Sequence, residues 1–226
     1  MPARAYVFDA YGTLFDVHSA IGKYREKAGP QADAFSELWR IKQLEYSWTF
    51  TLMDKYVPFW TLTERALDFC FEKFPNVDRS LKAPLLDAYK QLGAYPDARP
   101  ALEALRAKGL KTAILSNGST DMLSAAVDAA KLRDVLDFVL SVDEVGDFKP
   151  RLDVYDLAID TIGAEPGEIV FISSNRWDIA GAKNAGFKPI WVNRAGNPNE
   201  YADFAPVKVV KSLSEILSVV IPEARA

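Results

Sequence analysis

Residues 4–16 read RAYVFDAYGTLFD, and this stretch decides the fold that the sequence predicts. Its first part, from Arg4 to Asp9, is an apolar run of the kind that forms a buried strand in a parallel sheet. The Gly12-Thr13 pair that follows indicates a turn. Because open α/β sheets bind their ligands at the carboxyl ends of their strands, Asp9 is the first candidate for a catalytic residue.

Strand and helix patterns alternate from about residue 95 onward. Apolar runs predict strands at 110–117, 137–142, 168–174, 188–193 and 207–210. Helices are expected after Pro96, at 118–130, at 151–162, at 178–186 and after the last strand. This alternation is typical of a parallel sheet with helices on its faces.

The region between these two parts has a different character. From Val17 to about Leu92 the pattern is helical throughout, and aromatic residues are frequent. Four helices are predicted there, at 17–28, 32–54, 59–74 and 80–91. We therefore predict an α/β fold with a doubly wound, mostly parallel Rossmann-like sheet. Its core domain is expected in residues 1–15 and 95–226, and an all-helical cap domain is expected in residues 16–94.

The composition excludes several classes of function. Of the 226 residues, 49% are hydrophobic and 26% are charged, as in an ordinary globular protein. The net charge of −4 offers no basic surface for nucleic acid or for an anionic membrane. No run approaches the roughly 20 apolar residues that span a bilayer, and the first residues lack a signal-peptide pattern. A cytoplasmic location is therefore expected.

Two residue types are nearly absent, and this narrows the chemistry further. His18 is the only histidine, so a metal site built on several imidazoles is excluded and a serine or cysteine triad would depend on this residue alone. Cys70 is the only cysteine and lies between aromatic residues, which indicates core packing rather than a nucleophilic thiol. Acid and base roles therefore fall mainly to Asp, Glu, Lys or Tyr side chains, and a nucleophile is expected to be a carboxylate rather than an activated hydroxyl.

Polar clusters follow four of the predicted strands. Each cluster alone has a simpler explanation, since Asn117-Gly118 fits a turn, Ser174 or Asn175 fits a helix cap, and Lys149 fits a solvated charge. Because the carboxyl ends of parallel strands meet at one edge, we expect the four clusters to converge in one site. They comprise Asp9 with Thr13; Ser116 with Asn117 and Gly118; Lys149; and Ser173, Ser174, Asn175 and Asp178.

These motifs resemble those of the haloacid dehalogenase superfamily, whose phosphatases carry DxDGT, a strand-end Ser or Thr, a Lys before Pro, and GDxxxD. The resemblance runs along almost the whole chain. Two carboxylates of the phosphatase pattern are replaced, because Tyr11 stands for the second Asp of the first motif and Ser173-Ser174 stands for the Gly-Asp of the last. Such carboxylates hold Mg²⁺ and protonate the leaving group, so the replacements argue against phosphoryl transfer.

The chain is most similar to the L-2-haloacid dehalogenase branch of that superfamily. The similarity rests on DAYGT at 9–13, WRIKQLEYSW at 39–48, ILSNGS at 114–119, FKP at 148–150 and SSNRWD at 173–178. It implies that Asp9 attacks the α carbon of a short 2-haloalkanoate and displaces halide with inversion. Water then hydrolyses the ester on Asp9, giving a 2-hydroxy acid of opposite configuration without a metal or other cofactor.

The resemblance also implies roles for the other residues of the site. Lys149 would keep Asp9 ionised, Ser116 would bind the substrate carboxylate, and Arg40 with Asn117 would cradle the halide. The nucleophile or the hydrolytic water would be oriented by Thr13, Ser173, Asn175 and Asp178, with Asp178 as the base. Tyr155 would hydrogen-bond to Lys149 or Asp178. The apolar walls would be Tyr11, Leu44, Phe59 and Trp177.

For several of these residues the pattern also fits a structural role. On helical spacing alone, Arg40 fits a surface residue and the wall residues fit core packing. Two positions depart from the branch pattern. Ile41 replaces a glutamine that would lie at the pocket, which could change substrate size or halide preference. Arg176 replaces a small residue and could change the charge at the pocket entrance.

Other interpretations stay open beside the dehalogenase. A metal-dependent phosphatase or phosphonatase of the same superfamily would need Mg²⁺, and a binding module could keep the fold without activity. The presence of both the nucleophile and its cationic partner argues against the binding module. Relatives in the branch commonly dimerise, so a homodimer is expected.

Overall fold

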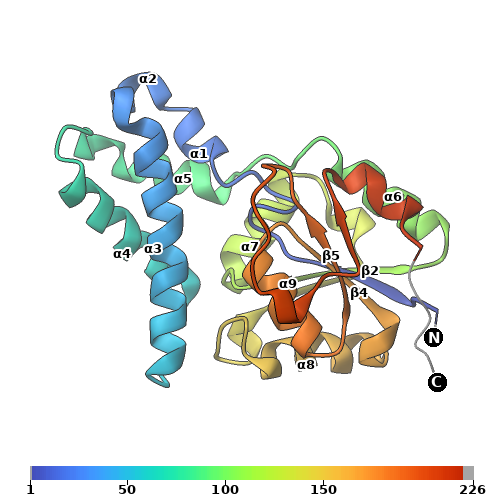
Figure 1. Ribbon diagram of the computed structural model, residues 1–226. Coiled ribbons are helices and arrows are strands. Elements are labelled where there is room, and N and C mark those ends of the chain that lie inside the picture. Colours follow the sequence, from blue (N-terminus) through green and yellow to red (C-terminus); the bar gives the residue numbers. More distant parts are fainter. Residues whose placement is uncertain (1, 221–226) are drawn as a thin grey trace.

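A computed structural model describes residues 2–220, and within them a six-stranded parallel sheet forms the centre of the molecule (Figure 1). The sheet order is β3-β2-β1-β4-β5-β6, with every neighbouring pair parallel. This confirms the doubly wound Rossmann-like core, and the order reverses between β1 and β4, where such sheets bind ligands. The strands are β1 (Ala5–Phe8), β2 (Lys111–Ser116), β3 (Phe138–Ser141), β4 (Ile169–Ser173), β5 (Lys188–Val192) and β6 (Lys208–Val210).

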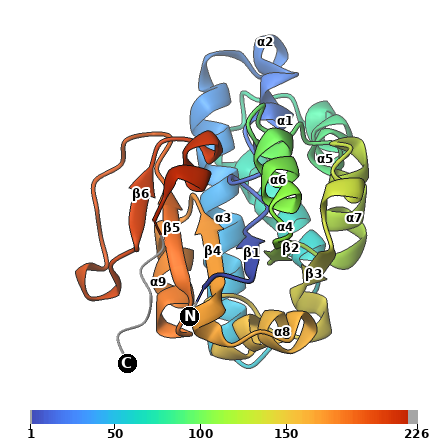
Figure 2. The same ribbon diagram turned by 90° about the vertical axis from the view of Figure 1, so that its right-hand side faces the viewer.

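Helices cover both faces of the sheet (Figure 2). On one face α6 (Ala98–Ala107) packs against β2 and α7 (Thr120–Ala129) packs against β3. On the other face lie α8 (Leu152–Ile162) and α9 (Arg176–Asn184), and α9 contacts β4 and β5. Because neither face meets water, every residue of β1 and β4 is buried, which explains their continuous apolar sequences.

A helical cap follows β1 in the chain and stands at one end of the sheet (Figure 1). Its two long helices, α3 and α4, pack along each other, and the ring centroids of Phe35 and Phe71 lie 5.1 Å apart between them. The cap helices are α1 (Ser19–Gly22), α2 (Arg25–Ala28), α3 (Ala32–Leu52), α4 (Phe59–Lys73) and α5 (Lys82–Lys90).

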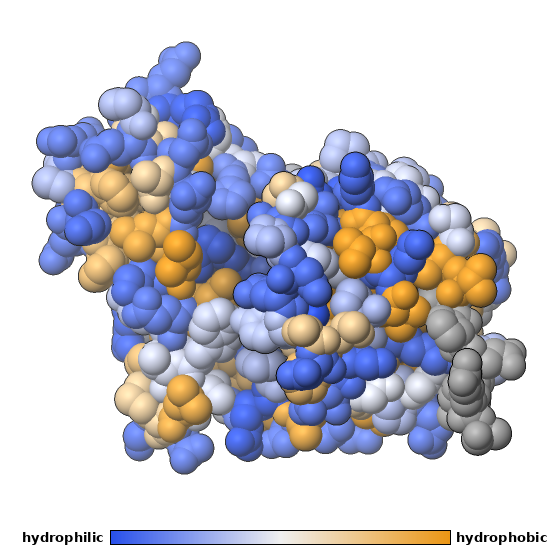
Figure 3. Space-filling view, in the orientation of Figure 1, coloured by the Kyte–Doolittle hydropathy of each residue, from blue (hydrophilic) through white to orange (hydrophobic). Residues whose placement is uncertain are grey.

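The two linkers between cap and core run side by side. The amide of Asp16 donates to the carbonyl of Gly93 at 3.0 Å, and the amide of Tyr95 donates to the carbonyl of Leu14 at 2.8 Å. A notch separates the two bodies at the top of Figure 3. These features support the predicted division into core and cap, which stays a prediction, and residues 1 and 221–226 of the predicted core lie outside the described part.

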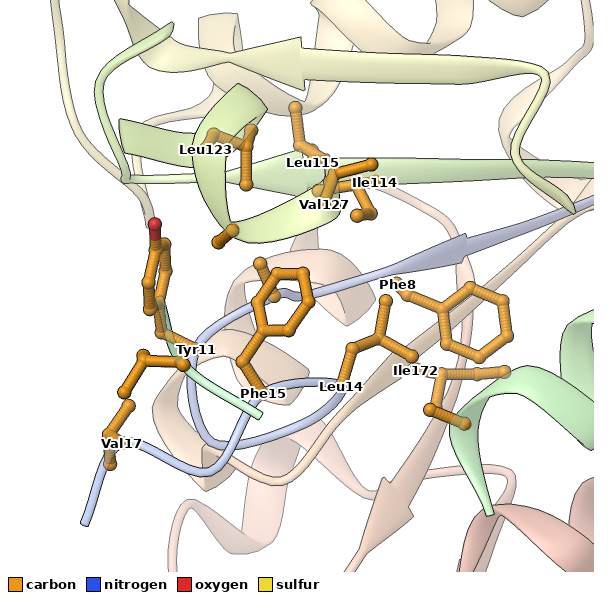
Figure 4. Close-up of a cluster of buried hydrophobic side chains, with 14 of the residues drawn as sticks. Phe8, Tyr11, Leu14, Phe15, Val17, Ile114, Leu115, Leu123, Val127 and Ile172 are labelled. Atoms are coloured by element: carbon orange, nitrogen blue, oxygen red, sulfur yellow. The ribbon is translucent and has the colours of Figure 1, made fainter. Parts of the chain in front are cut away.

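Apolar side chains anchor the turn that carries Asp9. Figure 4 shows Phe8 and Leu14 in one cluster with Ile114 of β2 and Val127 of α7. All four of these side chains are fully buried. Burial of each such side chain stabilises the fold by roughly 1.5–3 kcal/mol, so the cluster fixes the backbone on both sides of Asp9.

Two of the predicted helices are wrong in detail. The helix expected at 17–28 is two short helices, because Tyr24 leaves the helical conformation and packs against the core. The closing helix is a 3₁₀ helix at Leu213–Ser218. Its buried residues, Leu213 and Ile216, are three positions apart, and the 3₁₀ repeat of three residues per turn places both on the same side of the helix.

No helix within residues 2–220 is long and apolar enough to cross a membrane. The cytoplasmic location expected from the sequence stays a prediction.

Replacing Leu102 by alanine tests the packing of α6 on the sheet. Leu102 is fully buried, so the truncation should lower the free energy of unfolding by about 2–5 kcal/mol in urea titrations. The matched control is Leu152→Ala, at a position that is 44% exposed, where a change within about 0.5 kcal/mol is expected. Equal losses in the two variants would contradict the packing described here.

Candidate active site

Asp9 directly follows β1 and lies at the point where the strand order reverses. Its side chain is almost fully buried, and donors from two other segments bind one of its oxygens. Oδ2 accepts hydrogen bonds from Thr13 Oγ1 at 3.0 Å, from Asn175 Nδ2 at 2.7 Å and from Ser173 Oγ at 3.4 Å. The carboxylate is therefore held in one orientation, with Oδ1 facing a different partner.

That partner is Lys149, whose side chain is fully buried. Its Nζ lies 3.0 Å from Asp9 Oδ1 and 2.6 Å from Asp178 Oδ2, and it donates to the carbonyl of Leu115 at 3.0 Å. The three ammonium protons thus have three acceptors. Burial alone would lower the pKa of Lys149, but the two carboxylates outweigh it and raise the pKa, so the ammonium stays charged.

Asp178 is the third charged group of this buried cluster, which we call the Asp9–Lys149–Asp178 triad. Burial and the nearby charge of Asp9 raise the pKa of Asp178 to about 6, and Lys149 only partly opposes that rise. Tyr155 donates from its hydroxyl to Asp178 Oδ1 at 2.7 Å. Burial raises the pKa of Tyr155 well above its usual value, so the phenol keeps its proton and serves as a donor.

The turns after β1 and β4 are joined by hydrogen bonds. Thr13 accepts from the amide of Ser174 at 2.8 Å while its hydroxyl donates to Asp9. Gly12 precedes it with a φ of +92°, a left-handed conformation that favours glycine. The amide of Asn175 donates to Ser173 Oγ at 3.0 Å. The predicted clusters of the first and fourth strands therefore form one connected unit.

A small pocket with a volume of only about 10 Å³ lies over Asp9 where the cap meets the core. Arg40 reaches it from α3, and its Nη2 donates to the backbone carbonyl of Tyr11 at 3.2 Å. Two donors in the pocket have no partner of their own, Asn117 Nδ2 and the Tyr11 hydroxyl. The pocket is lined by Asp9, Tyr11, Arg40, Leu44, Phe59, Ser116, Asn117 and Trp177.

The structure thus brings together every residue that the sequence proposed for the site. The four expected apolar walls line the pocket. Of the expected orienting residues, Thr13, Ser173 and Asn175 bond to Asp9, and Asp178 bonds to Lys149. Tyr155 pairs with Asp178, one of the two partners foreseen for it. These positions agree with the roles implied by the resemblance, but the roles themselves stay predictions.

Two glycines make room for the site, and of these Gly118 belongs to a predicted cluster whereas Gly181 was not singled out by the sequence. A Cβ at Gly118 would lie 2.6 Å from the Tyr11 ring, and a Cβ at Gly181 would collide with the Tyr155 hydroxyl. Gly181 lies inside α9, and a glycine within a helical pattern is a signal of close approach that could have found it.

The placement of Ile41 at the pocket was wrong, whereas the interpretation of Arg176 stays a prediction. Ile41 is 56% exposed and does not line the pocket, because it points away from the core on α3. Arg176 is buried and donates to Asn199, to the carbonyl of Tyr201 and to the carbonyl of Phe204. It therefore fixes the segment around 199–204.

The Cys70 thiol takes no part in this chemistry, and metal-ligating side chains do not cluster in the described residues. Cys70 is buried, and burial raises the pKa of its thiol to about 12, which agrees with core packing. Within residues 2–220, no three or more His, Cys, Asp or Glu side chains gather closely enough to hold a metal ion. The Lys149 ammonium is the cation that lies between the buried carboxylates of Asp9 and Asp178.

Comparison with known proteins agrees with this geometry. A family model described as haloacid dehalogenase-like hydrolase matches residues 3–186. The (S)-2-haloacid dehalogenase 4A of Burkholderia cepacia is 52% identical over 215 residues, which are 94% of this chain and 93% of that protein. A crystal structure of a dehalogenase with an intermediate complex is 48% identical with a TM-score of 0.95, over 98% of each chain. The L-2-haloacid dehalogenase from Xanthobacter autotrophicus with chloropropionic acid covalently bound is 38% identical with a TM-score of 0.84, over 95% of this chain and 96% of that one.

Adding a methyl group at Gly181 tests the packing that lets Tyr155 reach Asp178. Gly181→Ala should lower the free energy of unfolding by about 1–3 kcal/mol, because the new Cβ overlaps the Tyr155 hydroxyl and lies 2.8 Å from Pro150 Cβ. The matched control is Gly22→Ala in α1, where nothing lies within 4 Å of the added atom and a gain of up to about 1 kcal/mol is expected. Urea unfolding measures both, and a neutral Gly181→Ala would refute the tight approach.

Proposed function

Because the chain belongs to the (S)-2-haloacid dehalogenases, within the haloacid dehalogenase-like hydrolases, we propose that it hydrolyses short L-2-haloalkanoic acids to D-2-hydroxy acids. The observation that carries this proposal is a buried carboxylate, Asp9, that faces a small, mainly apolar pocket and pairs with an ammonium group. A relative in which chloropropionic acid is covalently bound supports an ester intermediate.

In the first step, an oxygen of Asp9 attacks the α carbon from the side opposite the halogen. The carbon–oxygen bond forms as the carbon–halogen bond breaks, and the halide leaves with the electron pair, so the configuration inverts. The side chains of Arg40 and Asn117 receive the halide. The unpartnered amide protons of Asn117 support this role, because a buried donor without a partner fits an anion that arrives during the reaction.

The substrate carboxylate lies on the core side of the pocket. Ser116 Oγ accepts a hydrogen bond from the amide of Gly118 at 3.0 Å, so its own proton is free to donate to that carboxylate. Tyr11, Leu44, Phe59 and Trp177 surround the alkyl group and exclude bulk water. Their closeness limits the chain length that the pocket accepts.

In the second step, water attacks the carboxyl carbon of the ester on Asp9. Asp178 takes one proton of that water, the bond between the carboxyl carbon and the ester oxygen breaks, and the departing alkoxide takes that proton back from Asp178 to leave as the hydroxy acid. The second proton of the water is lost from the regenerated carboxyl group, which returns Asp9 to its carboxylate form. Loss of the Asp9 charge in the ester removes one cause of the raised pKa of Asp178, which makes Asp178 a carboxylate at the moment when it is needed as a base. Ser173 and Asn175 orient the reacting groups.

The proposal includes independence from divalent metal. Lys149 Nζ lies between the carboxylates of Asp9 and Asp178, in the position that a cation shared by both would take. Tyr11 also stands where phosphatases of the superfamily carry an acid, and a tyrosine with a strongly raised pKa cannot replace that carboxylate. A halide leaving group needs no proton, so the dehalogenase loses nothing by these replacements.

We also propose that the protein forms a homodimer through its cap. Ile41 on α3 is 56% exposed and Phe69 on α4 is 40% exposed, and α3 and α4 pack together. Large apolar side chains left exposed on adjacent helices are typical of an association surface.

The two enantiomers of 2-chloropropionate test the reaction. The purified protein should release chloride from the L enantiomer alone and form D-lactate, at an undiminished rate in EDTA, because Lys149 supplies the positive charge. Chloride release and chiral chromatography measure this. Asp9→Asn is the matched inactive variant, with mass spectrometry to exclude deamidation. Loss of turnover in EDTA, or hydrolysis of phosphate esters in place of halide release, would contradict the proposal and favour a metal-dependent phosphatase.

The pH dependence of turnover tests Asp178 as the base. The pKa of Asp178 is about 6 before reaction and falls in the ester, and only the carboxylate can accept a proton. Ester hydrolysis should therefore slow by about tenfold for each pH unit below the pKa of the ester form, which lies at or below about 6. Rapid-quench measurement of ester decay gives this profile.

Asp178→Asn should release one halide per active site and then stop, since the ester forms but is not hydrolysed. Asp153→Asn, in the exposed first turn of α8, is the matched control and should turn over normally. Continuous turnover by Asp178→Asn would remove Asp178 from the role of base.

A further inference from the structure

Trp48 ends the WRIKQLEYSW stretch at 39–48, and the reaction described above gives it no role. It lies on α3, one turn after the pocket wall Leu44, which itself follows Arg40 by one turn. Residues four positions apart lie on the same face of a helix, so the stripe that these two residues begin continues through Trp48 to Leu52. One face of α3 therefore runs along the active-site pocket and on to a second space.

That second space is a mainly apolar cavity of about 530 Å³ between α3 and α9. Trp48 and Leu52 line it from the cap, and Ala180 and Phe204 line it from the core. Trp177 lines it as well, and within residues 2–220 it is the one residue that the cavity shares with the active-site pocket. Trp177 is therefore the wall between the two spaces.

The Trp177 ring has a neighbour from each body of the molecule. From the core, Lys149 Nζ lies 6.0 Å from its centroid. From the cap, the Trp48 ring meets it edge-on, with centroids 5.4 Å apart and an interplanar angle of 80°. The turn of α3 that follows Trp48 is tied to the core, because Thr51 Oγ1 donates to Asp147 Oδ1 at 2.8 Å. Trp48 thus bears on Trp177 from a fixed stretch of helix.

The active-site pocket has to enlarge before it can take a 2-haloacid, since its volume of about 10 Å³ is the room that one water molecule needs. Two of its aromatic walls are buried and packed against further rings. Tyr11 stacks on Tyr89 with centroids 5.8 Å apart, and Phe59 lies 6.0 Å from the Phe148 ring. Trp177 is the aromatic wall with a larger cavity beside it, so its movement requires the least repacking.

We propose that Trp48 is a positioning residue that limits the chain length of the 2-haloacids accepted by this site, because it restrains Trp177. The proposal rests on the proposed dehalogenase function and deepens it. As Trp177 moves toward the cavity, the room that it leaves holds the alkyl chain of the substrate. Trp48 stops this movement early, so the unsubstituted protein favours short chains.

Trp48→Ala tests this, because it removes the restraint and leaves every wall of the active-site pocket in place. The readout is the ratio of kcat/KM for L-2-bromohexanoate to kcat/KM for L-2-bromopropionate. This ratio should rise by about tenfold or more, since accommodating one methylene in an apolar pocket changes kcat/KM by about 10-fold to 200-fold. Trp48→Phe keeps a smaller ring, so the ratio should rise by less. If Trp48→Ala does not fold, Trp48→Phe decides.

Trp60→Ala is the matched control, since Trp60 is a partly buried tryptophan of the cap whose ring lies 4.5 Å from Lys90 Nζ and lines neither space. It should leave the ratio unchanged. The proposal is overturned if the ratio also stays unchanged in the folded Trp48 variants, or if kcat/KM falls by one common factor for both substrates.

Binding measurements separate this proposal from the proposed function. Calorimetric titration with hexanoate and with propionate needs no turnover, and the Trp48 variants should favour hexanoate over propionate more strongly than the unsubstituted protein does. If the unsubstituted protein releases no halide from either substrate, the proposed function fails. The relative affinity for the two acids then decides the role of Trp48 alone, and an unchanged relative affinity overturns it.

Discussion

One ammonium group shared between two buried carboxylates is the interaction on which the rest of this site depends. Lys149 contributes one positive charge and Asp9 with Asp178 contribute two negative charges, all at or near zero exposure. Removing three charges from water costs free energy, and this desolvation cost is offset only when each charge has close partners in good geometry. The hydrogen bonds from Thr13 and Asn175 and the acceptor carbonyl of Leu115 meet that requirement.

The core and the cap contribute different groups to the site. The core supplies the charged triad and the donors that hold it, from the segments that follow β1, β3 and β4. The cap supplies Arg40 and two of the apolar walls, Leu44 and Phe59. Neither body encloses the pocket alone, because residues of both line it. The hydrogen bond from Arg40 to the carbonyl of Tyr11 connects the cap to the core at this pocket.

Much of this could be predicted because the signals are local. Continuous apolar runs identify strands of a sheet covered on both faces, and the residue after each run is placed by the parallel topology, as with Asp9 and Ser173. Signals that depend on tertiary packing could not be found in this way. The break at Tyr24, the 3₁₀ turn at Leu213 and the outward direction of Ile41 follow from what each residue meets in space. The stacking of Tyr89 on Tyr11 is of this kind, since only the fold brings the two rings together.

The paired linkers at residues 14–16 and 93–95 have a consequence for how such a chain can change over time. The cap leaves the sheet and returns to it at neighbouring points joined by two backbone hydrogen bonds. An inserted segment with adjacent ends can be lengthened, shortened or exchanged while the strands around it keep their register. New substrate preferences can therefore arise in the cap by recombination at one locus, and the inherited nucleophile need not move.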